Sequence, residues 1–326
     1  MRSNAQLLED IESYIAQIAI PTEPERLYAP IRYTLAEGGK RLRPMLTLLA
    51  HQLYSDKVTH AMPAAAAVEV FHNFTLLHDD IMDNADVRRG KPSVHVKWSE
   101  NVAILSGDAM VILAYRLLSQ SVSPDFSRIL EIFNTMAMQV CEGQQYDMDY
   151  ETQPKVAVAE YMNMIELKTS VLLGGATLIG AIIGGAKAEH QPIIQKFATE
   201  LGLAFQLQDD LLDTYGDERL GKPIGGDILE GKQTFLKIMA ISRATQEQRK
   251  ILNETHLSTE LTDEKKIERI TELYDALDIR HITELQIVTK FERALMLLSN
   301  LADLGVSAER IEPLKEYARS LMNREK

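Results

Sequence analysis

The stretch Leu76-Leu77-His78-Asp79-Asp80-Ile81-Met82-Asp83 decides how the rest of the chain is understood. An apolar run over residues 64–77 precedes it and predicts a helix, on which residues three and four apart are neighbours, so the aspartates share one face. Neighbouring carboxylates repel one another unless a cation neutralises them. Mg²⁺ suits this role, because it takes one or two carboxylates and keeps its other positions for water or phosphate. Taken alone, the motif is explained slightly better as a solvated acidic helix end.

A second copy of the motif stands far downstream, in Phe205-Gln206-Leu207-Gln208-Asp209-Asp210-Leu211-Leu212-Asp213. It also ends an apolar helical run, and two such copies are hard to explain as solvated surface. If the two helices face each other, their carboxylates could hold several Mg²⁺ ions between them. Such a cluster would bind a diphosphate and stabilise it as a leaving group. This pair of motifs is the strongest functional signal in the sequence.

The composition limits the kind of protein. The chain has 326 residues, of which 45% are hydrophobic, and a net charge of −12, which argues against a nucleic-acid partner. Its one cysteine, Cys141, excludes an internal disulfide and a cysteine-rich zinc site, so a reducing compartment is the simplest expectation. The first residues lack a secretory apolar segment. We therefore expect a cytoplasmic protein.

Helical periodicity dominates the chain. Apolar residues follow the spacing of a helix over residues 64–83, 102–119, 126–149 and 193–215, and breaks rich in glycine, proline and polar residues separate such segments. No convincing run of alternating β-branched residues is present, and no Pro/Ser-rich linker divides the sequence. We predict a single all-α domain over residues 1–326.

Residues 169–186 are almost uniformly apolar, so a membrane span has to be considered. Several glycines dilute the segment, and Lys168 and Lys187 bound it closely. A helix buried on all sides within a bundle, with glycines allowing close approach of neighbours, explains it better than a membrane span. We predict no transmembrane segment.

Basic residues occur where anions would bind. The segment Gly38-Gly39-Lys40-Arg41-Leu42-Arg43-Pro44 opens a predicted helix, whose backbone amides and positive end favour an anion. Lys40 and Arg43, one helical turn apart, could bind a phosphate together. Arg88 and Arg89 follow the first acidic motif and could make bidentate phosphate contacts.

Three lysines extend this pattern. Lys168 begins the buried helix, where a charge makes sense if it points into a functional cavity. Lys222 and Lys232 lie on a glycine-rich segment after the second acidic motif, which could close over a metal-bound phosphate. The segment also matches the opening of a P-loop, but Gln233 stands where that motif requires Ser or Thr, and no buried strand precedes it. Nucleotide binding is therefore rejected.

Two other functions remain open. His78-Asp79 could be the ligand pair of a helical metal-dependent phosphohydrolase, with His51, His60 and His72 as further ligands. That reading leaves the second acidic motif and the Gly-Lys segments unexplained. The other alternative is a non-enzymatic acidic bundle that binds Ca²⁺ or a partner, against which the basic residues beside each acidic cluster argue.

Taken together, the motifs from about Gly38 to Thr234, in this order, resemble the trans-isoprenyl diphosphate synthase family, also called polyprenyl synthetases. The resemblance implies an all-α bundle around a deep central cavity, usually assembled as a homodimer. It implies a prenyltransferase that joins isopentenyl diphosphate to an allylic diphosphate. It also implies Mg²⁺ as the cofactor, as three ions when substrate is bound.

The resemblance further implies roles for individual residues. The metal ligands would be Asp79, Asp83 and Asp209, supported by Asp80, Asp210 and Asp213. Isopentenyl diphosphate would be bound by Lys40, Arg43, His72 and Arg89. The allylic diphosphate and the reacting carbon would be held by Arg88, Lys168, Thr169, Gln206, Lys222 and Lys232, with Gln144 and Asp147 facing the metals. Of these, Arg88 and Lys168 would act with the aspartates in catalysis.

Product length is expected to depend on the helix before Asp79. Phe74 lies five residues before Asp79 and Phe71 one turn further, so both could project into the groove that holds the growing chain and form its floor. Thr75 is too small to close the groove nearer the metals. Among family members this combination resembles geranylgeranyl diphosphate synthases, so we predict a C20 product first and a C15 product second. The alternative is that both rings are ordinary core residues.

Overall fold

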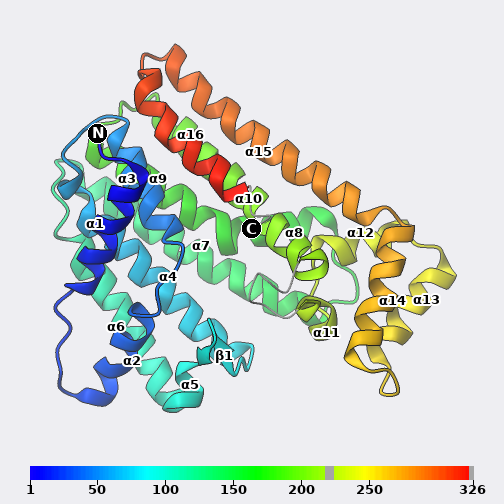
Figure 1. The fold of residues 1–326 in the computed structure, drawn as a ribbon. Helices are drawn as coiled ribbons and strands as arrows, with labels where there is room; N and C mark the ends of the chain where they lie inside the picture. Colours follow the sequence, from blue (N-terminus) through cyan, green and yellow to red (C-terminus); the bar gives the residue numbers. More distant parts are fainter. Residues whose placement is uncertain (217–223, 323–326) are drawn as a thin grey trace. The chain divides into compact units, whose positions relative to one another are not determined.

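The computed structural model describes residues 1–216 and 224–322 and is built almost entirely of helices (Figure 1). The only strands in these described ranges are β1 (Val87–Arg88) and β2 (Lys91–Pro92), which form one antiparallel hairpin. The predicted all-α fold class is therefore confirmed. The hairpin was not expected, because two-residue strands are too short to show alternation in the sequence.

Contacts divide the described chain into two compact units. Unit 1 comprises residues 1–134, 175–195 and 301–314, and unit 2 comprises residues 135–174, 196–300 and the described part of 315–326. The unit boundaries fall inside helices, so several helices contribute to both units. The single domain over residues 1–326 remains a prediction.

Unit 1 is organised around one long helix. Its first elements are α1 (Asn4–Ala16), α2 (Glu25–Leu35), α3 (Leu42–Gln52), the 3₁₀ turn η1 (Val58–His60), α4 (Met62–Met82), α5 (Val94–Lys97) and α6 (Glu100–Leu118). Helix α4 packs against α3 and α6. Its residues 62–68 are all apolar and buried, as expected of a helix at the centre of a bundle. Its last turn carries the first acidic motif.

The remaining helices form unit 2 or cross into it. They are α7 (Phe126–Thr152), α8 (Val158–Ile165), the π-helical turn η2 (Glu166–Ser170), α9 (Val171–Gly184), α10 (Gln191–Tyr215), α11 (Gly226–Glu230), α12 (Phe235–Arg243), α13 (Gln246–Leu257), α14 (Asp263–Ala276), α15 (Ile279–Asp303) and α16 (Ala308–Met322). One apolar core cluster of unit 2 is centred on Tyr161, Leu207 and Phe235. The second acidic motif ends α10.

Helix α9 shows why the apolar segment 169–186 contains glycines. A Cβ atom on Gly180 would lie 1.9 Å from the carbonyl oxygen of Thr47, and one on Gly184 would lie 2.7 Å from that of His51. Glycine therefore allows α9 to approach α3 closely. In the described ranges, Glu100–Leu118 and the continuous helical run Val158–Gly184 could cross a membrane by length and composition alone, yet 67% of the apolar window in the second is buried. This burial agrees with the predicted core helix.

Candidate active site

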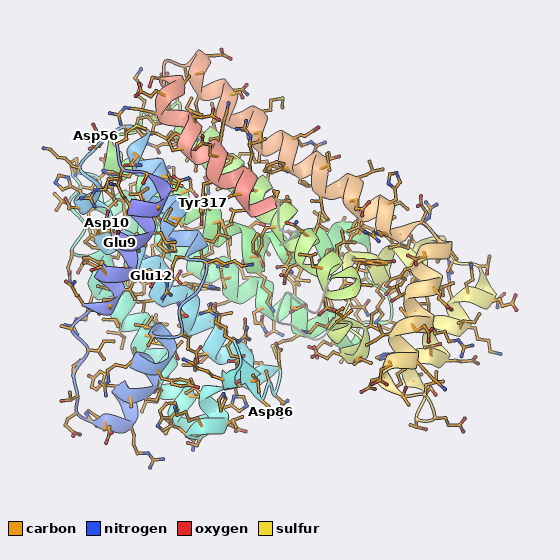
Figure 2. All side chains as sticks on the ribbon, in the orientation of Figure 1. Glu9, Asp10, Glu12, Asp56, Asp86 and Tyr317 are labelled. Carbon is orange, nitrogen blue, oxygen red and sulfur yellow. The ribbon has the colours of Figure 1, made fainter. Side chains whose placement is uncertain are left out.

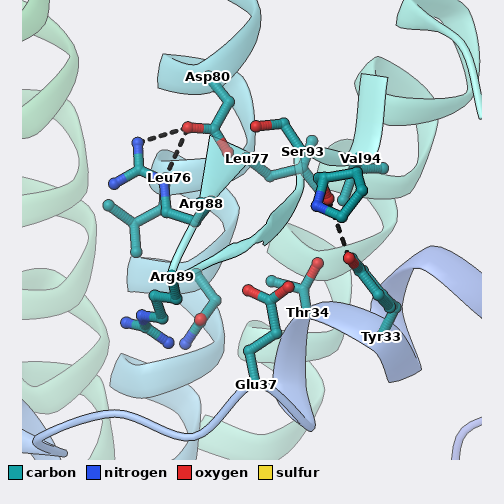
Figure 3. A pocket seen from close by; sticks show the side chains of 12 residues that line it. Tyr33, Thr34, Glu37, Leu76, Leu77, Asp80, Arg88, Arg89, Ser93 and Val94 are labelled. Carbon is teal, nitrogen blue, oxygen red and sulfur yellow. Dashed lines mark hydrogen bonds and ion pairs between the residues drawn. The ribbon is translucent and has the colours of Figure 1, made fainter. Parts of the chain in front are cut away.

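The end of α4 and the β1–β2 hairpin bring Asp80 and Arg88 together in unit 1 (Figure 3). Arg88 Nε donates to Asp80 Oδ1 at 2.7 Å, and its Nη2 bonds the same oxygen. Arg89 and Gly90 both have positive φ, as the two central residues of a two-residue type I′ hairpin require, and this turn directs Arg88 back towards α4. The hairpin is further tied down by Tyr33, whose hydroxyl donates to the Pro92 carbonyl at 2.9 Å.

Asp80 and Asp83 of the first motif lie in different environments. Asp80 is only 3% exposed, and burial raises the pKa of its carboxyl group, an effect that Arg88 opposes. Asp83 caps the helix, its backbone N–H donating to the Asp79 carbonyl at 2.8 Å, and its side chain is exposed. Asp80 is therefore already compensated by a cation of the chain itself, while Asp83 faces solvent.

A cluster of cations surrounds His72 on α4. Burial lowers the pKa of His72 well below its usual range, and the charges of Arg43 and Arg89 lower it further. Burial also lowers the pKa of Arg43 to about 10, with Arg89 again contributing. Gly39 lies against Arg89, since a Cβ on Gly39 would be 3.2 Å from the guanidinium nitrogens. The structure thus brings three predicted anion-binding residues together as a positive cluster that an anion would stabilise.

Arg41 anchors the start of α3, next to this cluster. It occupies the N-cap position of α3 with a left-handed backbone (φ 46°), and its side chain is 1% exposed. Nη1 donates to Glu69 on α4 at 2.8 Å, and Nε donates to Glu12 on α1, labelled in Figure 2, also at 2.8 Å. No sequence pattern indicates this role, because the buried partners are distant along the chain. Lys40 and Arg43 flank this anchored residue.

The second motif is built around Asp210 in unit 2. Asp210 is 5% exposed and accepts hydrogen bonds from the Tyr161 hydroxyl, from Gln206 Nε2 at 3.1 Å and from the Phe235 backbone N–H at 3.4 Å. Burial raises the pKa of Asp210 to about 6, although these donors oppose the shift. Because its oxygens already accept these hydrogen bonds, Asp210 is better suited to holding the neighbouring side chains in place than to binding a metal ion directly.

Asp227, which the sequence analysis did not single out, joins this motif. Its backbone N–H donates to Asp213 Oδ2 at 2.9 Å, which places the start of α11 beside the end of α10. Burial, together with the nearby charges of Asp213 and Asp210, raises the pKa of Asp227 to about 8. Its position in a Gly-Gly-Asp sequence after the second motif was the only available signal. The cluster has the hard oxygen donors and the excess negative charge that a divalent cation would neutralise.

Lys168 and Thr169 lie on the π-helical turn η2. Lys168 Nζ donates to Asp147 Oδ2 at 2.6 Å, and Thr169 Oγ1 donates to Gln206 Oε1 at 3.0 Å. A Cβ on Gly143 would lie 2.2 Å from the Lys168 backbone nitrogen, so a glycine there lets α7 pack directly on the turn. Single π turns of this kind are frequent at functional sites. The sequence predicted an ordinary buried helix and missed the turn.

Lys222 and Lys232 are the last two lysines predicted to bind the allylic diphosphate. Lys222 falls outside the described residues. Lys232 Nζ lies 2.9 Å from Glu230 Oε2 and 4.0 Å from Asp227 Oδ1. It therefore stands beside the acidic cluster of the second motif.

The two candidate floor residues also differ in exposure. Phe71 is 2% exposed and packs edge-on against Phe133, with ring centroids 5.5 Å apart. Phe74 is half-buried, and its ring lies 5.4 Å from that of Phe71. Only Phe74 of the pair offers substantial surface for a growing chain.

The histidines do not support the phosphohydrolase alternative. His51 is completely buried against α9, and His78 bonds the Ile104 carbonyl at 3.2 Å. Within residues 1–216 and 224–322, no three His, Cys, Asp or Glu side chains converge as a preformed metal site. Mg²⁺ commonly uses one or two carboxylates and completes its coordination with water and substrate phosphates, so the acidic motifs still fit it.

Comparison with known proteins agrees with these features. A family model described as polyprenyl synthetase matches residues 24–274. The chain is 44% identical over 237 residues to a geranylgeranyl diphosphate synthase of Methanosarcina mazei, covering 72% of this chain and 73% of that protein. It is 38% identical over 242 residues to a geranylfarnesyl diphosphate synthase of Aeropyrum pernix, covering 72% and 76%.

Solved structures extend the similarity over the whole chain. A crystal structure of a geranylgeranyl pyrophosphate synthase matches with a TM-score of 0.92 and 42% identity over 100% of both chains. A polyprenyl synthase of Caulobacter crescentus, solved with calcium and isoprenyl diphosphate, matches with a TM-score of 0.85 and 29% identity over 99% of this chain and 95% of that one. The predicted family is confirmed: this chain belongs to the polyprenyl synthetases.

Proposed function

We propose that this chain is a trans-prenyltransferase that condenses isopentenyl diphosphate with an allylic diphosphate. The observation that carries the proposal most is the grouping of Arg43, Arg89 and His72 on the α4 side of unit 1. Arg43 and His72 are half-buried and Arg89 is exposed, and positive groups held this close repel one another unless an anion accompanies them. A diphosphate supplies that anion, and the similarity to geranylgeranyl diphosphate synthases supports the same substrates.

Divalent metal chemistry fits the acidic motifs. The residues that would hold Mg²⁺, in three ions with substrate present, are Asp79, Asp83 and Asp209, with Asp80, Asp210 and Asp213 in support. When bound, the ions would neutralise negative charge on the departing diphosphate. The pairing of Asp80 with Arg88 and the hydrogen bonds to Asp210 support their secondary roles.

The basic residues would divide between the two substrates. Lys40, Arg43, His72 and Arg89 would bind isopentenyl diphosphate, and Arg88, Lys168, Lys222 and Lys232 would bind the allylic diphosphate. These side chains would stabilise the leaving group as the C–O bond breaks and an allylic cation forms. Thr169 and Gln206 would present oxygen atoms towards that cation.

Carbon–carbon bond formation then follows from this arrangement. The double bond of isopentenyl diphosphate attacks the cation, and the leaving diphosphate accepts the proton that is lost. The apolar helices would exclude water, which would otherwise capture the cation. The half-buried Phe74 is proposed as the floor that limits the product to C20, with C15 as the second choice.

A homodimer is proposed from an apolar surface on α6. Ile104, Leu105 and Ile112 are exposed on this helix, although each is a large hydrophobic residue. Such a surface is typical of a subunit interface. A cytoplasmic location is proposed because Cys141 is a free, exposed thiol, which suits a reducing compartment.

The proposal is tested by identifying products. Purified protein is incubated with Mg²⁺, radiolabelled isopentenyl diphosphate and dimethylallyl, geranyl or farnesyl diphosphate in turn. Label should enter a longer prenyl diphosphate, and a metal chelator should abolish the reaction. Release of phosphate without elongation would instead favour the phosphohydrolase, and absence of any conversion would favour the binding bundle.

A further inference from the structure

A continuous chain of hydrogen bonds crosses unit 2 from the protein core to Thr169. It begins at the Tyr161 hydroxyl on α8, which donates to Asp210 Oδ2. Gln206 Nε2 donates to Asp210 Oδ1 at 3.1 Å, and Thr169 Oγ1 donates to Gln206 Oε1 at 3.0 Å. Tyr161 is the first donor in this series of hydrogen bonds, yet the proposed function gives it no role.

The direction of each bond in this chain is fixed by chemistry. A carboxylate only accepts hydrogen bonds, so Asp210 requires the amide nitrogen of Gln206 to point towards it. The amide oxygen of Gln206 must then point the other way, where it accepts the hydrogen of the Thr169 hydroxyl. Both oxygen atoms keep a lone pair for a positively charged partner. A rotated Gln206 amide would present N–H groups instead, which would repel a cation.

Tyr161 is placed to keep Asp210 in this orientation. It is 2% exposed, and its ring packs within the same core cluster as Phe235, with ring centroids 6.4 Å apart. Among the described residues, the one other donor to Asp210 Oδ2 is the Phe235 backbone N–H, at 3.4 Å, which is a long hydrogen bond. The rigid phenol is therefore the main support of that carboxylate oxygen.

We propose that Tyr161 is a positioning residue that, through Asp210, orients the amide oxygen of Gln206 and the hydroxyl oxygen of Thr169 towards the developing allylic cation. This inference rests on the proposed prenyl transfer. Oxygen dipoles that are oriented before the reaction stabilise developing charge without reorganisation. Loss of the Tyr161 hydroxyl should therefore slow ionisation and leave substrate binding intact.

The test compares Tyr161→Phe with Tyr150→Phe. Tyr150 lies in the same core cluster and is 5% exposed, but it makes no described hydrogen bond to this chain of residues. In single-turnover reactions, Tyr161→Phe should lower the rate by about ten- to a hundredfold, less than the direct loss of a donor at a reacting oxygen. The KM values of both substrates should stay within about twofold of wild type. Tyr150→Phe should retain the wild-type rate.

A double-mutant cycle shows whether Tyr161 acts through Gln206. If it does, Gln206→Leu combined with Tyr161→Phe should be about as slow as Gln206→Leu alone, because the amide is already gone. Rate losses that multiply would overturn the inference, as would a wild-type rate in Tyr161→Phe. Failure of Tyr161→Phe to fold would also overturn it, since the residue would then be structural. A wild-type protein that elongates no prenyl chain would contradict the proposed function itself, which is a separate outcome.

Discussion

Asp80 is held by Arg88, whose Nε donates to its Oδ1 at 2.7 Å, so the middle carboxylate of the first motif is paired within the chain. The pair is built by the hairpin turn at Arg89-Gly90, which directs Arg88 towards the end of α4. A carboxylate neutralised in this way is a weaker candidate for a metal ligand than Asp79 or Asp83. It instead fixes an arginine proposed to bind the allylic diphosphate.

Substitutions at Asp79 and Asp80 should therefore change different kinetic parameters. Asp79→Asn should lower kcat by about three or more powers of ten, because a metal ligand is lost. Asp80→Asn should mainly raise the KM for the allylic diphosphate, by about tenfold, since an uncharged amide holds Arg88 less firmly. Steady-state kinetics over a range of Mg²⁺ concentrations separate the two effects. A larger shift in Mg²⁺ requirement for Asp80→Asn than for Asp79→Asn would contradict the assignment.

The Arg41–Glu69 ion pair should be important for stability. The two side chains are 1% and 3% exposed, so Arg41→Met leaves Glu69 buried without its partner. The loss should be about 3–5 kcal/mol, as for other broken buried pairs. Arg2→Met is the control, because the side chains of the Arg2–Asp10 pair are 42% and 32% exposed, and its loss should change stability by less than about 1 kcal/mol. Urea unfolding measures both variants, and equal losses would refute the distinction.

The sequence predicted the long helices well. Residues 64–83 were expected to be helical and α4 covers Met62–Met82, while 193–215 were expected and α10 covers Gln191–Tyr215. Periodicity succeeds here because each helix buries one or more apolar faces over many turns. The acidic and basic motifs were found for a similar reason, since their residues lie close together along the chain.

What the sequence missed depends on partners distant along the chain. Arg41 was placed only in a basic run, although its left-handed backbone and its bonds to Glu12 and Glu69 anchor the start of α3. The π turn at Glu166–Ser170 packs closely against Gly143, which no local pattern reveals. Such features are set by tertiary contacts, and local propensity does not encode them.

His51 should make stability depend on pH. Burial lowers its pKa below the ordinary value of 6.5, so the folded protein keeps it neutral while the unfolded chain can take up a proton. Its contribution to stability is present above pH 6.5 and is lost as the pH falls towards its folded-state pKa. Compared with His51→Leu, wild type should lose about 1.4 kcal/mol more per pH unit in this window. Urea unfolding at several pH values measures the difference, and parallel pH profiles would show that His51 does not contribute.

Product length should respond to Phe74 more than to Phe71. Phe74→Ala opens the floor of the proposed groove, so products longer than C20 should form. Phe71→Ala alone should have a smaller effect, because its ring is 2% exposed and packed on Phe133. Chromatography of the dephosphorylated products measures the chain lengths. Unchanged products from both single variants and from the double variant would show that neither ring is the floor.

The central claim is that both acidic motifs act with Mg²⁺ in prenyl transfer, and turnover of Asp209→Ala tests it most directly. Asp303→Ala is the matched control, because Asp303 is exposed at the C-terminal end of α15, where an acidic side chain adds little stability. With isopentenyl and farnesyl diphosphates at saturating Mg²⁺, Asp209→Ala should lose about three or more powers of ten in kcat, while Asp303→Ala stays near wild type. Near-normal turnover by Asp209→Ala would contradict the account.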